Sequence, residues 1–360
     1  MKYIKLFFLL VLLISLFTLP VNAANTDSTL EDIYDLLPDS AKEIMGQEGL
    51  LKGDFAEQLD TAGLFSLIFR FFKEGLDSPL SALAKGISVL ILSALMTGYA
   101  QSNKIGAAVD SVCMLSTSLI MALPVYEIIA ASRQALKGVC TFMTGAVPVF
   151  AAVKAASGKP VSITGGAGVL LFACQALSYL CAFLVVPFMN SYLALSICSS
   201  FGGKNTAAGI MNGIKKVSMW VLSLCASIFV FVLGAKGTLG KGADTVAMKT
   251  AKFVLGTTVP VVGTALSESA SNVAASLSAL SGTAGIYIIL GVVIIILPLL
   301  IELVCWRLLL MVFKYLSVLF SVPNISSLAE SLESVLSLLL GFCLLCVFLL
   351  IISLGVRISL

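Results

Sequence analysis

The chain alternates long apolar runs with short polar connections. A run of about 20 apolar residues is long enough for a helix to cross a bilayer. Six runs of roughly that length centre near Leu92, Leu119, Leu180, Val221, Ile294 and Leu344. Three weaker runs cover residues 139–156, 188–200 and 308–322. The pattern predicts an all-α transmembrane domain over residues 81–360, with six to nine passes.

The composition agrees with a polytopic helical membrane protein. Hydrophobic residues make up 59% of the chain and charged residues 11%, and the mean hydropathy is +1.07. Soluble domains have about a quarter of their residues charged. Lysines lie on both sides of the run at Val221, so the excess of positive charge on the cytoplasmic side does not orient the passes.

The first 23 residues have the pattern of a secretory signal peptide. Lys2 and Lys5 precede an apolar stretch over residues 6–19, and small residues end at Ala23, where a signal peptidase would cleave. The alternative is an uncleaved anchor, because the apolar stretch is only slightly short for a spanning helix.

Residues 24–80 differ sharply from the rest of the chain. They hold twelve acidic and four basic residues, a net charge of −8. Acidic segments of this length cross membranes readily, so we expect an acidic extracytoplasmic region. Serine and glutamate at capping-box spacing predict two short helices, separated by Pro38. The two capping pairs are Ser28 with Glu31 and Ser40 with Glu43.

The last part of this region is strongly apolar. Residues 64–76, LFSLIFRFFKEGL, carry only three charges among many large apolar side chains. This pattern predicts a helix that lies at the membrane interface. A helix packed on the transmembrane domain would have the same pattern.

One apolar segment is broken in a way that ordinary spanning helices avoid. Residues 250–269 contain Gly256, Pro260 and Gly263, and Glu268 lies near the end of the segment. In hydrocarbon, each backbone group that a proline frees must find a partner in protein or water. The segment is therefore predicted to line a path or to act as a hinge.

A second segment resembles this one and indicates an internal repeat. Residues 141–150 align with residues 251–262, so that Gly145 matches Gly256 and Pro148 matches Pro260. The predicted repeats cover about residues 105–204 and 215–320, and duplicated halves with such breaks are typical of transporters. Because Gly and Pro are common in membrane helices, the match could also be accidental. The residues predicted to line a path or to form hinges are Gly145, Pro148, Gly256, Pro260, Gly263 and Glu268.

Charged residues inside apolar runs are costly and are therefore functional candidates. Glu302, Arg307 and Lys314 are the predicted intramembrane charges. Glu302 and Arg307 are five residues apart, so a pair between them needs a kink, or each needs another partner. Snorkelling at a helix end is the favoured reading of Asp110, Glu127 and Arg307.

The sequence argues against an enzyme. It contains no histidine, which removes the commonest general base and most zinc sites, and no phosphate-binding loop. All nine cysteines lie in apolar segments, and the pair Cys343 and Cys346 is expected to pack inside a helix. We expect no catalytic residue, no cofactor and no metal site.

Several segments together resemble a known family. The order of signal peptide, acidic exported region and polytopic domain is similar to that of stage III sporulation protein AE of endospore-forming bacteria. The likeness runs from about Leu30, and it is most specific between Lys215 and Leu300. It rests on KKVSMWVLSL at residue 215, TAKFVLGTTVPVVGTALSES at residue 250 and ILPLL at residue 296. The serine-rich stretch after Ser321 departs from the family pattern.

The resemblance implies a function and partners. Family members are regarded as permease-like components of the complex that joins the mother cell to the forespore, needed for forespore gene expression after engulfment. The N-terminal region would face the space between the two forespore membranes. Partners would be proteins of the same operon, including an ATPase and ring-forming proteins, a forespore membrane protein and lipid, but not nucleic acid. Two alternatives stay open: an autonomous secondary transporter of a small solute and a non-conducting scaffold.

Overall fold

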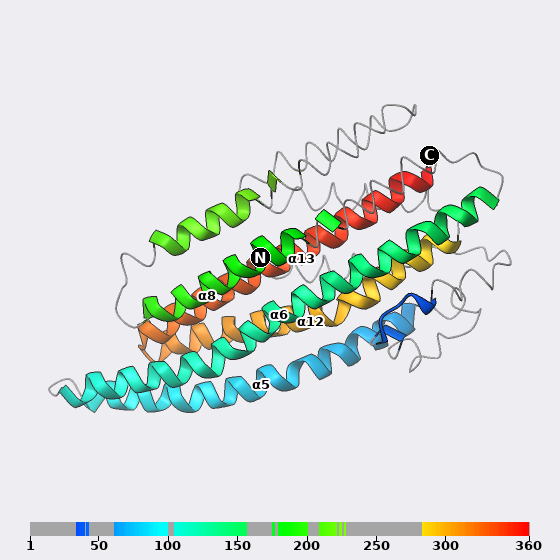
Figure 1. Cartoon of the computed structure of the whole chain (residues 1–360). Helices are drawn as coiled ribbons and strands as arrows, with labels where there is room; N and C mark the ends of the chain where they lie inside the picture. Colours follow the sequence, from blue (N-terminus) through cyan, green and yellow to red (C-terminus); the bar gives the residue numbers. More distant parts are fainter. Residues whose placement is uncertain are drawn as a thin grey trace.

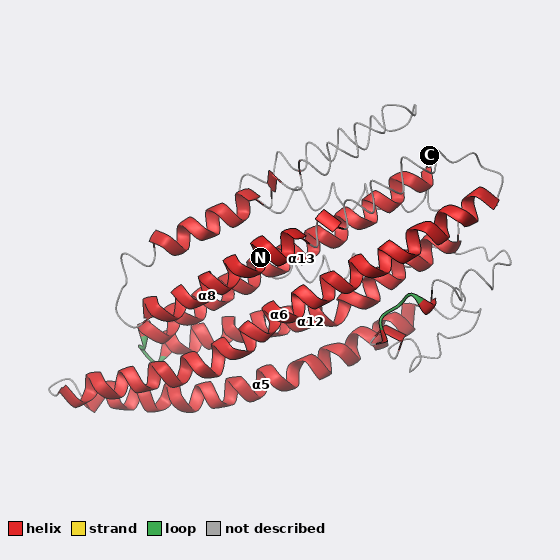
Figure 2. Cartoon of the chain, in the orientation of Figure 1, coloured by secondary structure: helices red, strands yellow, loops and turns green. Residues whose placement is uncertain are grey.

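The computed structural model describes residues 34–39, 41–42, 61–99, 104–156, 175–176, 179–200, 209–221, 223–224, 227 and 283–359. In these ranges all regular secondary structure is helical, as Figure 2 shows. The predicted signal peptide and the broken segment at residues 250–269 lie outside the described residues.

Four long helices form the body of the protein. They are α5 (Thr61–Tyr99), α6 (Lys104–Ala156), α12 (Thr283–Leu319) and α13 (Pro323–Ser359). A short π-helix, η1 (Cys181–Val185), leads into α8 (Val186–Ser200), and a further helix covers residues 209–221. Figure 1 shows the long helices side by side, with residues 209–221 at the edge away from α5.

The long helices form two antiparallel hairpins, α5–α6 and α12–α13. α12 is central, because it packs against α5, α6 and α13. Both hairpin connections lie at the same end of the bundle, on the left in Figure 1. We call the half near them the turn-side half. It holds residues 77–99 of α5, 104–126 of α6, 303–319 of α12 and 323–339 of α13.

The other half is the strap-side half. It contains the remaining residues of these four helices and a short N-terminal segment, residues 34–42, which we call the strap. Contacts at glycines show which residues of the long helices lie at the same level. In the turn-side half Gly86 of α5 faces Met121 and Phe313, and in the strap-side half Gly291 of α12 faces Phe142.

Among the described residues, some neighbouring apolar runs join into one longer helix. The run near Leu119 and the run at residues 139–156 are one helix, α6, because Gly145 and Pro148 do not interrupt it. The runs near Ile294 and at 308–322 likewise join in α12, apart from the turn that follows Leu319. Among the described residues, four helices are long and apolar enough to span a membrane, and residues 183–199 form a shorter apolar helix.

These helices are longer than a membrane is thick. At 1.5 Å per residue, the 53 residues of α6 extend about 80 Å, whereas the hydrocarbon core is about 30 Å thick. The 37 residues of α12 extend about 56 Å. Some of each helix must therefore lie outside the hydrocarbon.

The apolar residues 64–76 belong to α5, which continues without a break to Tyr99. Ile68, Phe71 and Phe72 pack against a small cluster on α12 that includes Leu297 and Ile301. The described part of this segment therefore packs on the bundle, and its position at the membrane interface stays a prediction.

The strap is seated on three glycines of two different helices. A methyl group on Gly145 would lie 2.7 Å from Leu36, one on Gly291 3.2 Å from Leu37, and one on Gly138 3.9 Å from Pro38. Leu37 and Ala41 are buried in the main core. The strap is helical on both sides of a break at residues 36–38, as the position of Pro38 predicted. It ties the N-terminal region to α6 and α12.

A tight turn reverses the chain between α12 and α13. The amide of Ser321 donates to the carbonyl of Val318 and the amide of Val322 to that of Ser317, both at 3.0 Å. These two bonds define a Schellman motif, in which the residue after the helix is left-handed. Ser321 accordingly has a φ of 58°, and Pro323 then starts α13 with a fixed helical φ.

Candidate functional site between α12 and α13

A group of four charged side chains links α12 to α13. The Arg307 Nε lies 4.0 Å from Oε1 of Glu333. The Lys314 Nζ lies 3.4 Å from Oε2 of Glu330 and 4.0 Å from Oε2 of Glu333. Glu333 thus stands between the two cations, and the group has no net charge.

Helix periodicity explains why these side chains meet. Arg307 and Lys314 are seven residues apart, which is two turns of α12, and therefore lie on one face. Glu330 and Glu333 are three residues apart on α13 and also share a face. The short turn at residues 320–322 holds the two helices antiparallel, so that the cationic face meets the anionic one.

The pairing is largely shielded from solvent. The side chains of Arg307 and Glu333 are 16% and 13% exposed, while that of Glu330 is 63% exposed. Desolvating charges is expensive, and mutual attraction offsets the cost only when every charge has a partner. Removing Glu333 would leave shielded positive charge without this carboxylate in the α12–α13 hairpin, whereas Glu330 is largely open to solvent.

A hydroxyl group extends the site to α8. The Tyr192 side chain, which is almost fully buried, shares a hydrogen bond with that of Ser334 on α13. Glu330 is close enough to Tyr192 to act on it electrostatically. Three helices therefore contribute polar groups to one region.

The first turns of α13 carry a polar face. Glu330 and Ser327 are both exposed, although the segment belongs to a span that runs from Pro323 to Phe348. Ser331 donates to the carbonyl of Ser327 at 2.9 Å, which satisfies its hydroxyl within the helix. The Glu330 carboxylate has no such internal partner on α13, and an exposed carboxylate among lipid chains is costly. This face is therefore suited to water or to another protein.

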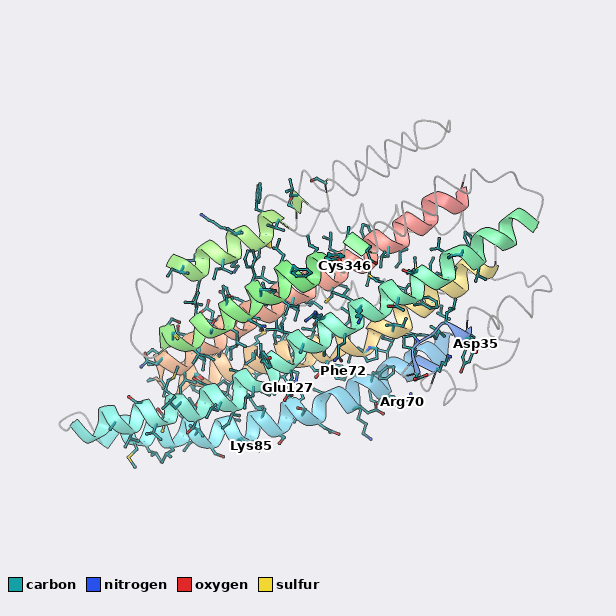
Figure 3. The ribbon with its side chains drawn as sticks, in the orientation of Figure 1. Asp35, Arg70, Phe72, Lys85, Glu127 and Cys346 are labelled. Carbon is teal, nitrogen blue, oxygen red and sulfur yellow. The ribbon has the colours of Figure 1, made fainter. Side chains whose placement is uncertain are left out.

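The predicted intramembrane charges are brought together only in part. Arg307 and Lys314 belong to the group, and Arg307 is paired in mid-helix rather than snorkelling at a helix end. Glu302 is elsewhere: it is within electrostatic range of Glu127 on α6, which Figure 3 labels. Gly75 of α5 packs against the backbone of Glu302. Glu302 and Glu127 therefore lie at the boundary between the two halves.

Two of the predicted path-lining residues, Gly145 and Pro148, lie on α6. Gly145 lies under the strap, where the lack of a side chain lets Leu36 approach, and Pro148 is exposed on α6. Gly256, Pro260, Gly263 and Glu268 lie outside the described residues. The structure therefore places neither Gly145 nor Pro148 in the α12–α13 site, and their roles as path or hinge residues stay predictions.

Sequence reasoning missed the anionic half of the site. Glu330 and Glu333 lie in the serine-rich stretch after Ser321. The structure shows that this stretch leads into α13 and forms its first turns. Their spacing on one helical face, opposite Arg307 and Lys314 across a short turn, was the available signal. Within the described part of the chain, no three Cys, Asp or Glu side chains are grouped to hold a metal ion.

The fold and the site define a polytopic helical membrane protein with charges paired inside its spanning helices. The sequence matches the family described as stage III sporulation protein AE over residues 40–359. The chain therefore belongs to the stage III sporulation protein AE family.

One relative is the stage III sporulation protein AE of Bacillus subtilis (strain 168). It is 26% identical over 264 residues, which cover 72% of this chain and 64% of the relative. The match thus spans a little under two thirds of that relative's length. No solved structure matches the chain.

Proposed function

We propose that this protein is a permease-like membrane component of the complex that joins the mother cell to the forespore, required for sporulation after engulfment. Family membership over residues 40–359 carries this proposal. The polar face of α13 supports a permease-like role, because a spanning helix that exposes Ser327 and Glu330 needs water or a protein partner beside it.

The proposed location is the mother-cell membrane around the forespore. If the N-terminal region is exported, the strap places the strap-side end of the bundle in the space between the two membranes. The α5–α6 and α12–α13 connections then face the mother-cell cytoplasm. The proposed partners are the ATPase and ring-forming proteins of the same operon and a forespore membrane protein.

The experiment that tests this proposal neutralises the exposed carboxylate of the site. Glu330→Gln keeps the shape of the side chain and removes its charge. In an endospore-forming host that depends on this protein, we expect normal accumulation in the membrane but loss of forespore gene expression and of spores. This result is expected because the charge of Glu330 would act in a path or a docking face, so that its loss removes function and leaves the folded protein in place.

The matched control is Glu74→Gln on α5. Glu74 is 64% exposed, almost the same as Glu330, and it also has a cationic neighbour, because Arg70 lies 3.8 Å away. We expect this variant to sporulate as the unmodified protein does. Normal sporulation of Glu330→Gln would contradict a role for the α13 face, and sporulation defects that simply follow protein loss would favour the scaffold.

A further inference from the structure

The outward surfaces of α5, α6 and α12 change character at the boundary between the two halves. In the turn-side half, large apolar side chains point outward from all three helices, at helical spacing on α6 and α12 and in two groups on α5. On α6 the exposed residues are Val112, Leu115, Leu119, Leu123 and Tyr126. On α5 they are Leu80, Ile91, Leu92, Leu95 and Met96. On α12 they are Leu308, Val312, Tyr315, Val318 and Leu319.

On α5 and α6 the same faces are mainly polar in the strap-side half. The stripe on α6 continues through Arg133, Lys137 and Thr141, which are all exposed. On α5 Lys73 and Glu74 are exposed, with Phe69 as the one large apolar side chain exposed among the described residues there, and exposed Asp77 lies at the boundary. The change from polar to apolar falls near residue 78 on α5 and near residue 127 on α6.

These two changes are at one level of the bundle. Gly75 of α5 touches Cys305 and Ile301 on α12, and Glu127 of α6 acts electrostatically on Glu302. At the next level, Gly86 of α5 meets Met121 and Phe313 together. The exposed apolar residues of the three helices therefore form one continuous zone, which we call the belt.

The height of the belt fits a bilayer. The stripe on α6 rises about 21 Å from residue 112 to residue 126, and residues 80 and 96 of α5 are about 24 Å apart along the helix, so the belt fits within the hydrocarbon thickness of about 30 Å. One charged side chain on these three faces, Lys85, is exposed inside the belt. It lies less than two turns from the boundary, and its long stem can carry the ammonium group to the interface.

In the strap-side half, other parts of the protein bury most of α12, which is the most apolar helix. Within the span Ile288–Leu319 of α12, the most apolar stretch of 18 residues has a mean hydropathy of 3.1, yet 78% of its residues are buried inside the protein. Residues such as Ile288, Ile296 and Leu303 are buried by α5, α6, α13 and the strap. Apolar sequence here reflects a protein core rather than a lipid contact.

We propose that lipid chains cover only the turn-side half of the α5–α6–α12 face, and that the strap-side half stands outside the hydrocarbon core. At the opposite edge, the helix at residues 209–221 also exposes Met219 and Trp220, but exposed Lys215 and Lys216 interrupt its apolar surface. The charged group of Arg307, Lys314, Glu330 and Glu333 then lies at membrane depth. The inference rests on the chain being a membrane protein and not on what it conducts.

Spin labels on one stripe of α6 test this inference. Single cysteines replace Leu119 in the belt or Thr141 in the strap-side half, in a cysteine-free background reconstituted into phospholipid vesicles. Oxygen partitions into lipid and a nickel chelate stays in water, so their relaxation of the label reports its surroundings. We expect Leu119→Cys to be oxygen-dominated and Thr141→Cys to be nickel-dominated, with the ratio several-fold different. Leu95→Cys and Lys73→Cys form the matched pair on α5.

Two results would overturn the inference. Oxygen-dominated signals at both Thr141→Cys and Lys73→Cys would place the strap-side half in lipid, as the apolar run at residues 139–156 alone would have it. Nickel-dominated signals at Leu119→Cys and Leu95→Cys would place the belt in water. If the cysteine-free protein fails to fold, Leu119→Trp and Thr141→Trp with native cysteines replace it. Brominated lipid should then quench added fluorescence only in Leu119→Trp.

Discussion

The two halves of the bundle differ in what they bury and what they expose. The turn-side half shields Arg307 and Glu333 between α12 and α13 and shows mainly apolar side chains outward on α5, α6 and α12. The strap-side half keeps its most apolar residues inside, around α12, and shows charges outward on α5 and α6. The comparison shows that in this protein the direction in which a residue faces, and not the hydropathy of its segment, distinguishes a membrane contact from a core.

In both halves, glycines lie where neighbouring helices come close together. In the turn-side half, a methyl group on Gly86 would lie 2.4 Å from the end of Met121, a flexible side chain, and 2.9 Å from the ring of Phe313. In the strap-side half, one on Gly291 would lie 2.5 Å from the buried ring of Phe142. The strap-side glycines also admit the strap, so that half should tolerate substitution less well.

The largest effect should follow from breaking the inward charges of the turn-side half. Glu333→Gln removes the carboxylate that lies between Arg307 and Lys314. Loss of one partner from a buried ion pair costs about 3–5 kcal/mol. We expect a large fall in the midpoint of thermal unfolding in detergent and in the amount of protein in the membrane. Replacing Glu333 and Arg307 together by Gln and Met should recover part of the loss, and no recovery would mean that the two side chains do not act as a pair.

The next effect should come from the strap-side half. Gly291→Leu forces atoms into the space that Phe142 and Leu37 occupy, and overpacking of a core costs about 1–3 kcal/mol. The control is Gly341→Leu on α13, an exposed glycine with no atom of a described residue within 4 Å of an added methyl group. We expect Gly291→Leu to lower the thermal midpoint and Gly341→Leu to leave it unchanged or raise it. Equal effects of the two variants would show that the strap-side core is not tightly packed at Gly291.

The smallest effect concerns the turn that sets the α12–α13 hairpin. Ser321 adopts a left-handed backbone at a φ of 58°, which costs a non-glycine residue roughly 1–2 kcal/mol. Glycine avoids that cost but loses about 0.5–1 kcal/mol of chain entropy. Ser321→Gly should therefore stabilise the protein by about 0.5–1 kcal/mol, seen as a small rise in the thermal midpoint. Ser321→Val should lower it, and a rise in that variant would rule out a left-handed residue here.

Much of the architecture could be predicted from the sequence, because it depends on local composition. The apolar runs predicted an all-helical membrane protein, and Pro38 predicted a break that the strap shows. The charges at Arg307 and Lys314 were identified as intramembrane candidates because they interrupt apolar runs. The interruption that Gly145 and Pro148 suggested is absent, because α6 continues through both residues. The number of passes stays a prediction.

The sequence by itself determined that the chain is helical, that it is apolar enough for a membrane and that its acidic residues gather near the N-terminus. These properties follow from residue type and spacing. Only the tertiary structure decided which apolar residues face protein and which face outward, because burial in a core and exposure to lipid favour the same side chains. It also decided that Glu333 stands between Arg307 and Lys314, since that contact joins two helices across a turn and no spacing along one helix can specify it.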